Sequence, residues 1–406
     1  MKKIITYLLI FSTISITGCT GDLDIASAAF KDCSQNVVLP TPKSWPATDS
    51  KKILPPKHGV YAGLYNIGTT KQAYYNFTKQ TGKPPSLVYT FHDFILEKDL
   101  FSNNPRVRTF KEPLEGDGSP DPLTFAAEIS KNNSFLALSW AIECCDFSSK
   151  SLWYNLSKPN NIVPRLLKGD FDKEIRIAAK EIKAFGQPLM LSIFGEFHQQ
   201  SRFLFGKDGR TQMNNTDNIC GHYGDPKWPD GPERVRDTIT HIIDIFRQEK
   251  VKNVTWFMYT STRYMDPTFD EPPKWIHPKF FYPGDAYMDW VGQSAYFIDP
   301  GNRPKVNKEF HDIVSALKPG YDAWGEVTQK PMLLAEFGAP SDGKSSRAKI
   351  LRKVLKDYLP GLNRVKAFTF ANAVLFRDYF ELPLLGQFPD EVTTWKEVVT
   401  HNPYYK

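Results

Sequence analysis

Residues 189–196 read LMLSIFGE, a short apolar run that ends in a glutamate, and residues 332–338, MLLAEFG, repeat this pattern farther along the chain. Runs of this length that stay apolar, without the alternation of a half-exposed strand, are typical of strands buried on both faces of a parallel sheet. Six further runs have the same character, and the eight together cover residues 60–65, 86–91, 135–141, 189–194, 254–259, 290–296, 332–337 and 366–371. The sequence therefore predicts a parallel sheet of eight strands.

The segments between these runs carry apolar residues at helical spacing. In residues 173–185 the apolar stripe consists of Ile175, Ala178, Ala179, Ile182 and Phe185. Similar stripes run through residues 232–247 and 346–359. Eight strand-helix units over roughly 350 residues predict an α/β fold, the (β/α)8 TIM barrel, with enlarged loops. The alternative is an open doubly wound sheet, which would need a glycine-rich phosphate turn after an early strand, and the chain has no GxGxxG motif.

The N-terminal residues resemble a bacterial export signal. Lys2 and Lys3 precede an apolar stretch of about 13 residues, which is too short for a stable membrane span. Residues 16–19 read ITGC and resemble a lipobox, so residues 1–18 are predicted to be a lipoprotein signal peptide whose cleavage leaves lipidated Cys19. An ordinary signal peptide followed by a disulfide cysteine is the alternative. The lipid would hold an exported protein in the bacterial cell envelope, at the outer membrane or the cell surface.

Three parts of the chain are expected from this pattern. The signal peptide, residues 1–18, is followed by residues 19–57, which contain several prolines and no persistent helical or strand period. This second part is predicted to be a tether that starts at lipidated Cys19. Residues 58–406 are predicted to form the (β/α)8 domain.

Once Cys19 carries lipid, the remaining cysteines are Cys33, Cys144, Cys145 and Cys220. An exported chain can keep disulfides, and four cysteines allow three connectivities. We expect Cys220 to lie near Cys144 or Cys145, because the loops after the third and fourth strands are neighbours on a barrel rim. The alternative is a zinc site with His222, but the spacing matches no CxxC pair, so no metal is predicted.

A lone glutamate follows the fourth apolar run, Glu196, and another closes the seventh, Glu336. In a (β/α)8 barrel the catalytic groups lie at the C-terminal ends of the strands, where a charge beside an apolar strand is costly unless it is paired or functional. Long side chains from strands four and seven can converge across the barrel mouth. Retaining glycosidases need two such carboxyl groups, one protonated and one ionised. The alternative for each glutamate is an ion pair with a nearby Arg or Lys.

Several further segments resemble glycoside hydrolase family 26, which includes β-mannanases, mixed-linkage glucanases and β-1,3-xylanases. The matching segments are GVYAG at 59–63, GQPL at 186–189, VTW at 254–256, YPGD at 282–285, DWVGQSAY at 289–296 and AEFG at 335–338. The resemblance implies that Glu196 is the acid/base, that Glu336 is the nucleophile, and that Tyr296 hydrogen-bonds Glu336 and positions it. For Tyr296 the alternative is a core tyrosine with a satisfied hydroxyl.

The chain departs from the family's pattern beside the acid/base. The family usually has a His immediately before this residue, whereas this chain has Gly195, and it continues with Phe197, His198 and Gln199 where Asn-Gly is commoner. Groups beside the acid help to bind the sugar at the cleavage point, so the resemblance does not name the sugar. The departure also admits an alternative function, a catalytically degenerate, carbohydrate-binding lipoprotein of the same fold.

Other polar and aromatic residues are expected at the mouth, where a sugar would bind. Substrate contacts are predicted for His92, Trp140, His198, Tyr223, Trp228 and Asn372. Core packing is the alternative for Trp140, and loop solvation is the alternative for the polar residues. A Ser-His-Asp hydrolase is not supported, because no GxSxG motif occurs.

The predicted function is a retaining, endo-acting glycoside hydrolase that cleaves a β-linked polysaccharide: a β-mannan, a β-glucan or a bacterial exopolysaccharide. Such a reaction requires no cofactor. The expected partners are the polysaccharide and, through the lipid on Cys19, the membrane; the protein itself is expected to be a monomer. The formal net charge is +6, but no basic run or arm suited to nucleic acid occurs, so no nucleic-acid partner is expected.

Overall fold

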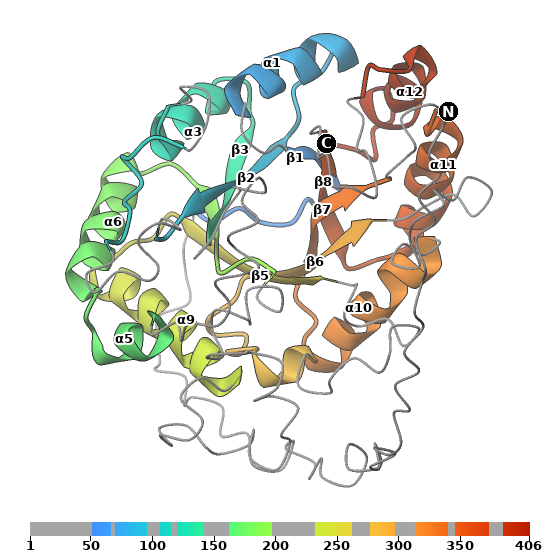
Figure 1. Ribbon diagram of the computed structural model, residues 1–406. Helices are drawn as coiled ribbons and strands as arrows, with labels where there is room; N and C mark the ends of the chain where they lie inside the picture. The colour runs from blue at the N-terminus through green and yellow to red at the C-terminus, as the bar shows by residue number, and fades with distance from the viewer. Residues whose placement is uncertain are drawn as a thin grey trace, which may run out of the picture.

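A computed structural model describes residues 51–65, 70–95, 106–114, 120–141, 162–196, 232–261, 277–296, 313–339, 346–372 and 385–406 of the chain. Within these residues, eight parallel strands close into a barrel in the order in which they occur in the sequence (Figure 1). The strands are β1 (Tyr61–Tyr65), β2 (Leu87–Asp93), β3 (Phe135–Ala141), β4 (Leu189–Ile193), β5 (Val254–Ser261), β6 (Trp290–Tyr296), β7 (Met332–Gly338) and β8 (Val365–Ala371). Each coincides with one predicted apolar run, and the (β/α)8 TIM barrel is confirmed.

Helices cover the outside of this barrel (Figure 1). The α-helices are α1 (Thr70–Thr81), α3 (Pro122–Ser130), α5 (Ile162–Lys168), α6 (Asp172–Phe185), α9 (Pro232–Gln248), α10 (Ile313–Val327), α11 (Ala348–Arg352) and α12 (Pro389–Trp395). Helices α6 and α9 match two of the predicted helical segments. Among the helices that the structure describes, none combines the length and the apolar character that crossing a bilayer would require.

The third predicted helix, residues 346–359, is irregular in the structure. Helix α11 continues as a π-helical segment, η9 (Lys353–Tyr358), and then as a 3-10 turn, η10 (Leu359–Gly361). Pro360 has no backbone N–H to donate, so the hydrogen bonds of the π-helical segment do not continue past this point. A second π-helical segment, η11 (Lys396–Thr400), follows α12, and a 3-10 turn, η7 (Pro278–Phe280), precedes β6.

The strands bury apolar side chains on both faces. One core lies inside the barrel and includes Tyr89, Met190, Phe257 and Leu333. Their neighbours in sequence point the other way and pack under the helices, as do Val88, Leu191, Met258 and Leu334. Because neither face meets water, the strands read as continuous apolar runs instead of alternating ones, which is the pattern used above to predict them.

The N-terminal ends of the strands form the base of the barrel, which is closed by the first described residues. Ile53 is buried; its N–H donates to Thr255 Oγ1 at 2.7 Å, and its carbonyl accepts from Trp290 Nε1 at 3.0 Å. Lys52 pairs with Asp289 at 2.6 Å. The end of the segment predicted as a tether therefore packs against the barrel base, at the opposite end from the mouth formed by the C-terminal strand ends.

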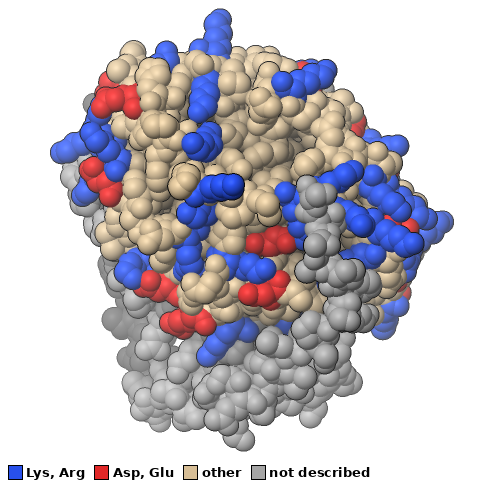
Figure 2. Space-filling view, turned by 180° about the vertical axis from the view of Figure 1, so that it is seen from behind, with Lys and Arg blue, Asp and Glu red and all other residues tan. Residues whose placement is uncertain are grey.

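Charged side chains are spread over the described face that Figure 2 shows. In the view from behind Figure 1, Lys and Arg side chains are scattered across the described surface, with fewer Asp and Glu among them (Figure 2). Several of the basic side chains form surface pairs, such as Lys318 with Asp322 on α10 and Arg352 with Glu397. Exposed pairs of this kind contribute little to stability, about 0–1 kcal/mol each.

A buried ion pair fastens the chain that leaves β7. Arg347 and Glu391 have side chains only 2% and 0% exposed, and Arg347 Nη2 lies 2.7 Å from Glu391 Oε2. Arg347 Nε donates to Glu391 Oε1 at 3.0 Å, and Nη1 donates to the carbonyl of Ala339 at 3.2 Å. The pair therefore joins the end of β7, which carries Glu336, to helix α12.

Replacing the acid of this pair is expected to cost much stability. Glu391→Ala leaves the guanidinium of Arg347 buried without its countercharge, so we expect the free energy of unfolding to fall by about 3–5 kcal/mol. Asp322→Ala, at the exposed Lys318–Asp322 pair, is the matched control and should cost less than about 1 kcal/mol. Denaturant unfolding of both variants measures the difference; equal losses would show that the buried pair contributes no more than a surface pair.

Candidate active site

Two glutamates lie at the mouth of the barrel, where β4 and β7 end. Glu336 lies on β7 and is 7% exposed, while Glu196 follows β4 and is partly buried. Ser294 on β6 connects them: it stands beside Glu336 in the strand register, and its hydroxyl donates to Glu196 Oε1. One small side chain between the two acids places both carboxyl groups on the same side of the mouth.

A bulge in β7 aims Glu336 into the barrel. Against β6, Gln293 pairs with Leu334 but Ser294 pairs with Glu336, so the register slips by one residue at Ala335. In a regular strand Ala335 and Glu336 would point to opposite faces, yet Ala335 belongs to the inner core and Glu336 hydrogen-bonds inward-facing side chains. The bulge is therefore what brings a carboxylate into the mouth.

The backbone around Glu196 is strained. Phe194 and Glu196 have φ angles of 55° and 47°, in the left-handed region that residues with a Cβ rarely adopt. Each such conformation costs on the order of 1–3 kcal/mol and persists only where the surroundings impose it, as they often do at functional sites. The Gly195 N–H between them donates to Ser139 Oγ at 3.1 Å, which fixes the turn to β3.

Two tyrosines hold the carboxylate of Glu336. Tyr296, which the resemblance assigned to this carboxylate, donates its hydroxyl to Oε2 at 2.8 Å. Tyr259 on β5 donates to Oε1 at 3.3 Å, and Tyr259 in turn hydrogen-bonds Tyr89 on β2 at 2.5 Å. Each oxygen of Glu336 thus has a phenol donor, and hydrogen bonds to the charged form of a carboxyl group favour its ionisation.

The phenols beneath Glu336 remain protonated. Burial raises the pKa of Tyr65, of Tyr89 and of Tyr259 well above its usual value, and the negative charge of Glu336 raises each of them further. The three phenols are therefore neutral near pH 7, and Tyr89 and Tyr259 take part in hydrogen bonds as neutral hydroxyls. Sequence reasoning missed all three, although each places a hydroxyl on an inward position of an otherwise apolar run.

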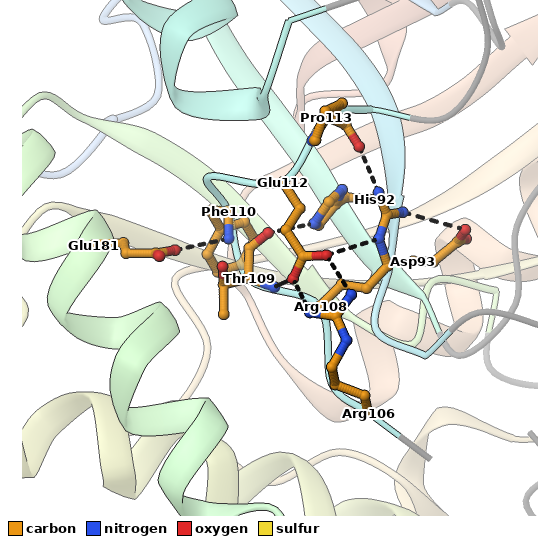
Figure 3. Close-up of polar contacts among 9 residues, drawn as sticks. All are labelled: His92, Asp93, Arg106, Arg108, Thr109, Phe110, Glu112, Pro113 and Glu181. Atoms are coloured by element: carbon orange, nitrogen blue, oxygen red, sulfur yellow. Dashed lines mark hydrogen bonds and ion pairs between the residues drawn. The ribbon is translucent and has the colours of Figure 1, made fainter. Parts of the chain in front are cut away.

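His92 is not at the mouth, and its prediction as a substrate contact is wrong. It is 2% exposed and lies against Phe110, and its Nε2–H donates to the carbonyl of Thr109 at 2.9 Å (Figure 3). Burial, together with the nearby Arg108 guanidinium, lowers the pKa of His92 to about 4. The ring is therefore neutral near pH 7 and packs between β2 and residues 106–114.

The polar groups around His92 hold residues 106–114 in place. Figure 3 shows Arg106 reaching Glu112, at 2.7 Å, and Arg108 reaching Asp93 at the end of β2, at 3.6 Å. On the other side, Glu181 of α6 accepts from the N–H of Phe110 at 2.9 Å. These contacts anchor the connection after β2 to the barrel and to α6.

Trp140 also differs from its predicted role, whereas Asn372 is bound to the chain through one of its side-chain atoms. Trp140 is fully buried in the outer core, with its ring 4.6 Å from that of Phe94 and 4.8 Å from that of Phe110, so it offers no face to a sugar and the prediction is wrong. Asn372, which follows β8, is 4% exposed, and its side-chain oxygen accepts from the N–H of Leu385 at 2.6 Å. That oxygen binds the backbone at Leu385, and the substrate contact of Asn372 stays a prediction.

Several predicted residues lie outside the described part of the chain. These are the substrate contacts His198, Tyr223 and Trp228, the lipidation site Cys19, and the cysteines Cys33, Cys144, Cys145 and Cys220. Their roles stay predictions. Within the described ranges, no group of three or more His, Cys, Asp or Glu side chains is arranged to hold a metal ion.

Comparison with solved structures finds the same barrel in other proteins. The GH26 domain of an endo-β-mannanase/endo-β-glucanase from Prevotella bryantii matches with a TM-score of 0.50 and 12% identity, over 86% of this chain and 90% of that one. A GH26-CBM35 β-(1,4)-mannanase from Podospora anserina matches with a TM-score of 0.48 and 13% identity, over 86% and 62% of the two chains. A Bacillus subtilis mannanase, man26, matches with a TM-score of 0.45 and 13% identity, over 84% and 86%.

Sequence comparison adds nothing to this likeness: no protein-family model and no curated protein matches the chain. At 12% identity, the match to the Prevotella bryantii domain concerns architecture alone. The chain has the closed, eight-stranded (β/α)8 barrel that this GH26 domain also has.

Proposed function

We propose that this protein is a retaining, endo-acting glycoside hydrolase that cleaves a β-linked polysaccharide, a β-mannan, a β-glucan or a bacterial exopolysaccharide. The observation that carries the proposal is the pair of glutamates at the mouth. Tyr296 and Tyr259 each donate to one oxygen of Glu336, and Ser294, which lies on β6 with Tyr296, donates to Glu196. We expect the two carboxyl groups to lie about 4.5–6.5 Å apart, a range that includes the separation of about 5–5.5 Å that a retaining mechanism uses.

The surroundings of the two acids support different roles for them. Glu336 receives two phenol hydrogen bonds, which favour the ionised form and suit a carboxylate that attacks. Glu196 is less buried, and the donor identified for it is the hydroxyl of Ser294. A carboxyl group nearer to solvent can take up and release a proton between the two steps, which suits the acid/base.

The reaction follows from these roles in two steps. Glu336 attacks the anomeric carbon while Glu196 gives its proton to the departing glycosidic oxygen, so the glycosidic bond breaks and a glycosyl ester with Glu336 forms. Glu196, now ionised, takes a proton from water, whose oxygen attacks the anomeric carbon and releases Glu336. Both acids return to their starting states, and the sugar keeps its β configuration.

The position of the enzyme in the cell is part of the proposal. Lipid on Cys19 would tether the exported protein to the cell envelope, and the described chain begins at the barrel base, where Lys52 and Ile53 are bound. The mouth lies at the opposite end of the barrel from this attachment. Such an arrangement would leave the site open to a polymer outside the membrane.

A second function has one observation in its favour, which is Gly195 where the resembling family usually has a His. A carbohydrate-binding lipoprotein would keep the barrel and its aromatic residues without turnover. Incubating the soluble mature protein with a panel of β-mannans, β-glucans and bacterial exopolysaccharides separates the two functions. New reducing ends from one of these polymers support the enzyme, whereas binding without any new reducing end supports the binding protein.

A further inference from the structure

The space beside Gly195 is filled by two side chains, Ser139 and Tyr259. A Cβ on Gly195 would lie 2.4 Å from Ser139 Oγ, and 2.6 Å from both Cε1 and the hydroxyl of Tyr259. Contacts below 3.0 Å are essentially never seen for a Cβ, so no larger residue fits while these side chains stay in place. Tyr259 can therefore occupy its position only because residue 195 has no side chain.

These side chains belong to a hydrogen-bond chain that crosses the interior of the barrel. The Gly195 N–H donates to Ser139 Oγ at 3.1 Å, and Ser139 hydrogen-bonds Tyr89. Tyr89 meets Tyr259 at 2.5 Å, and Tyr259 reaches Glu336 Oε1 at 3.3 Å. Ser139, Tyr89 and Tyr259 are fully buried, so water does not compete for these contacts.

The direction of the chain follows from proton counting. Tyr259 has one hydroxyl proton, and the carboxylate of Glu336 is a stronger acceptor than a neutral phenol, so Tyr259 donates to Glu336. Its oxygen then accepts from Tyr89, and Tyr89 accepts from Ser139. Every donor thus points from the turn that carries Glu196 towards Glu336, and each bond polarises the next one.

We propose that the chain from Ser139 through Tyr89 to Tyr259 positions Glu336, with Tyr259 as the positioning residue that binds the carboxylate directly and Gly195 as the residue that makes room for it. The inference rests on the proposed function, since it assigns the chain to the nucleophile of that reaction. The same chain ties the backbone beside Glu196 to the carboxylate of Glu336. A shift at one acid is therefore resisted at the other.

The ionisable groups around Glu336 determine how a change in this hydrogen-bond chain would alter the protonation of Glu336. Among the described residues, these groups include Tyr296 on β6, Tyr259 on β5, Tyr89 on β2, Tyr65 on β1 and Glu196 after β4. Burial raises the pKa of Tyr65, Tyr89 and Tyr259, so these phenols stay neutral during an assay. Removing the Tyr259 hydroxyl hence removes a donor without removing a charge, and a carboxylate that loses a donor is protonated more readily.

Tyr259→Phe is the variant that tests the proposal, because it keeps the ring that fills the space beside Gly195. We expect kcat/KM to fall about tenfold or more, the usual consequence of losing a hydrogen bond to a charged group. The acidic limb of its pH profile should move upward by about one pH unit, because the nucleophile must be ionised to attack. Tyr74→Phe, which removes a buried hydroxyl bonded to Ser134 on the outside of the barrel, is the matched control and should leave the limb in place.

A titration that needs no turnover separates this inference from the proposed function. In protein labelled with 13C at the glutamate carboxyl groups, the Glu336 signal is identified by its loss in Glu336→Gln. Its midpoint should lie at higher pH in Tyr259→Phe than in the wild type, and unchanged in Tyr74→Phe. Equal midpoints in the wild type and in Tyr259→Phe overturn the chain, whether or not the protein cuts a glycan.

Gly195→Ala approaches the same chain from its other end. The added methyl group must displace Ser139 or Tyr259, so the Glu336 midpoint should again rise. Gly361→Ala is the matched control, because a Cβ there meets nothing within 4 Å. If Gly195→Ala leaves the Glu336 midpoint where it is in Gly361→Ala, the space beside Gly195 does not govern the carboxylate and the proposal fails.

Discussion

Glu336→Gln is expected to lower turnover by roughly 10⁴-fold or more on every polysaccharide that the wild type cuts. The amide has nearly the shape of the carboxylate; its oxygen can still accept from one of the hydroxyls of Tyr296 and Tyr259, and its NH2 group can donate to the oxygen of the other, so the fold and the glycan affinity should change little. What is lost is the atom that forms the bond to the anomeric carbon. Reducing-end release gives the turnover, and calorimetric titration with the same glycan gives the affinity.

Glu326→Gln is the matched control for this change, because it makes the same substitution at a side chain that is 71% exposed on α10. It should match the wild type in both measurements. Turnover by Glu336→Gln within tenfold of the wild type would contradict the assignment of the nucleophile. Such a result would mean that another group at the mouth is the nucleophile.

Glu196→Ala should give a different pattern. Without the acid, a natural polysaccharide must lose a poor leaving group unaided, so its cleavage should fall by about 10²–10⁴-fold. An activated aryl glycoside, if it binds, needs no protonation and should still form the ester with Glu336. That ester then accumulates because no base activates water, and a burst of aryl alcohol followed by a slow phase is the expected time course.

Azide distinguishes this stalled state from a merely damaged protein. It attacks the anomeric carbon without a base, so Glu336 leaves and a β-glycosyl azide forms from Glu196→Ala. Glu336→Gln should form no such β product, because it makes no ester. Failure of azide to speed the slow phase of Glu196→Ala would argue that Glu196 is not the base.

The strands could be predicted from the sequence because burial on both faces removes the need for polar residues. The run at 332–337 shows this well: Leu333 faces the inner core and Leu334 the outer one, and both positions are apolar. Helices α6 and α9 were equally visible, since each keeps one apolar stripe. The segment at 346–359 was harder, because a helical stripe does not reveal where the hydrogen-bond pattern changes to that of a π-helix.

The site could be predicted only in part, for a related reason. Position at a strand end does not say which way a side chain points. Phe91 packs against the inner core, so its neighbour His92 points outward, and Trp140 likewise follows the inward-facing Ser139. In a continuous apolar run, the sequence does not show which residues face inward and which face outward. Glu336 faces inward only because a bulge at Ala335 shifts the alternation, and no sequence pattern predicts that bulge.

Tyr259 went unnoticed because nothing in its own run distinguishes it from a core tyrosine. Its role emerges from contacts with Tyr89 and Glu336, which lie 170 and 77 residues away in sequence. The sequence shows that Gly195 stands where the resembling family usually has a His, but it does not show why. Only the fold shows that Tyr259 and Ser139 occupy the space that a side chain at Gly195 would need.

The central claim is that Glu196 and Glu336 cut a β-glycosidic bond by double displacement. It is tested most directly by proton NMR of the anomeric configuration of the first-formed reducing end, recorded while the wild type digests the polysaccharide that it cuts in the panel. The account predicts that the β anomer appears first and mutarotates to the equilibrium mixture, because two inversions restore the starting configuration. Appearance of the α anomer first would contradict the account, since it would show a single displacement by water.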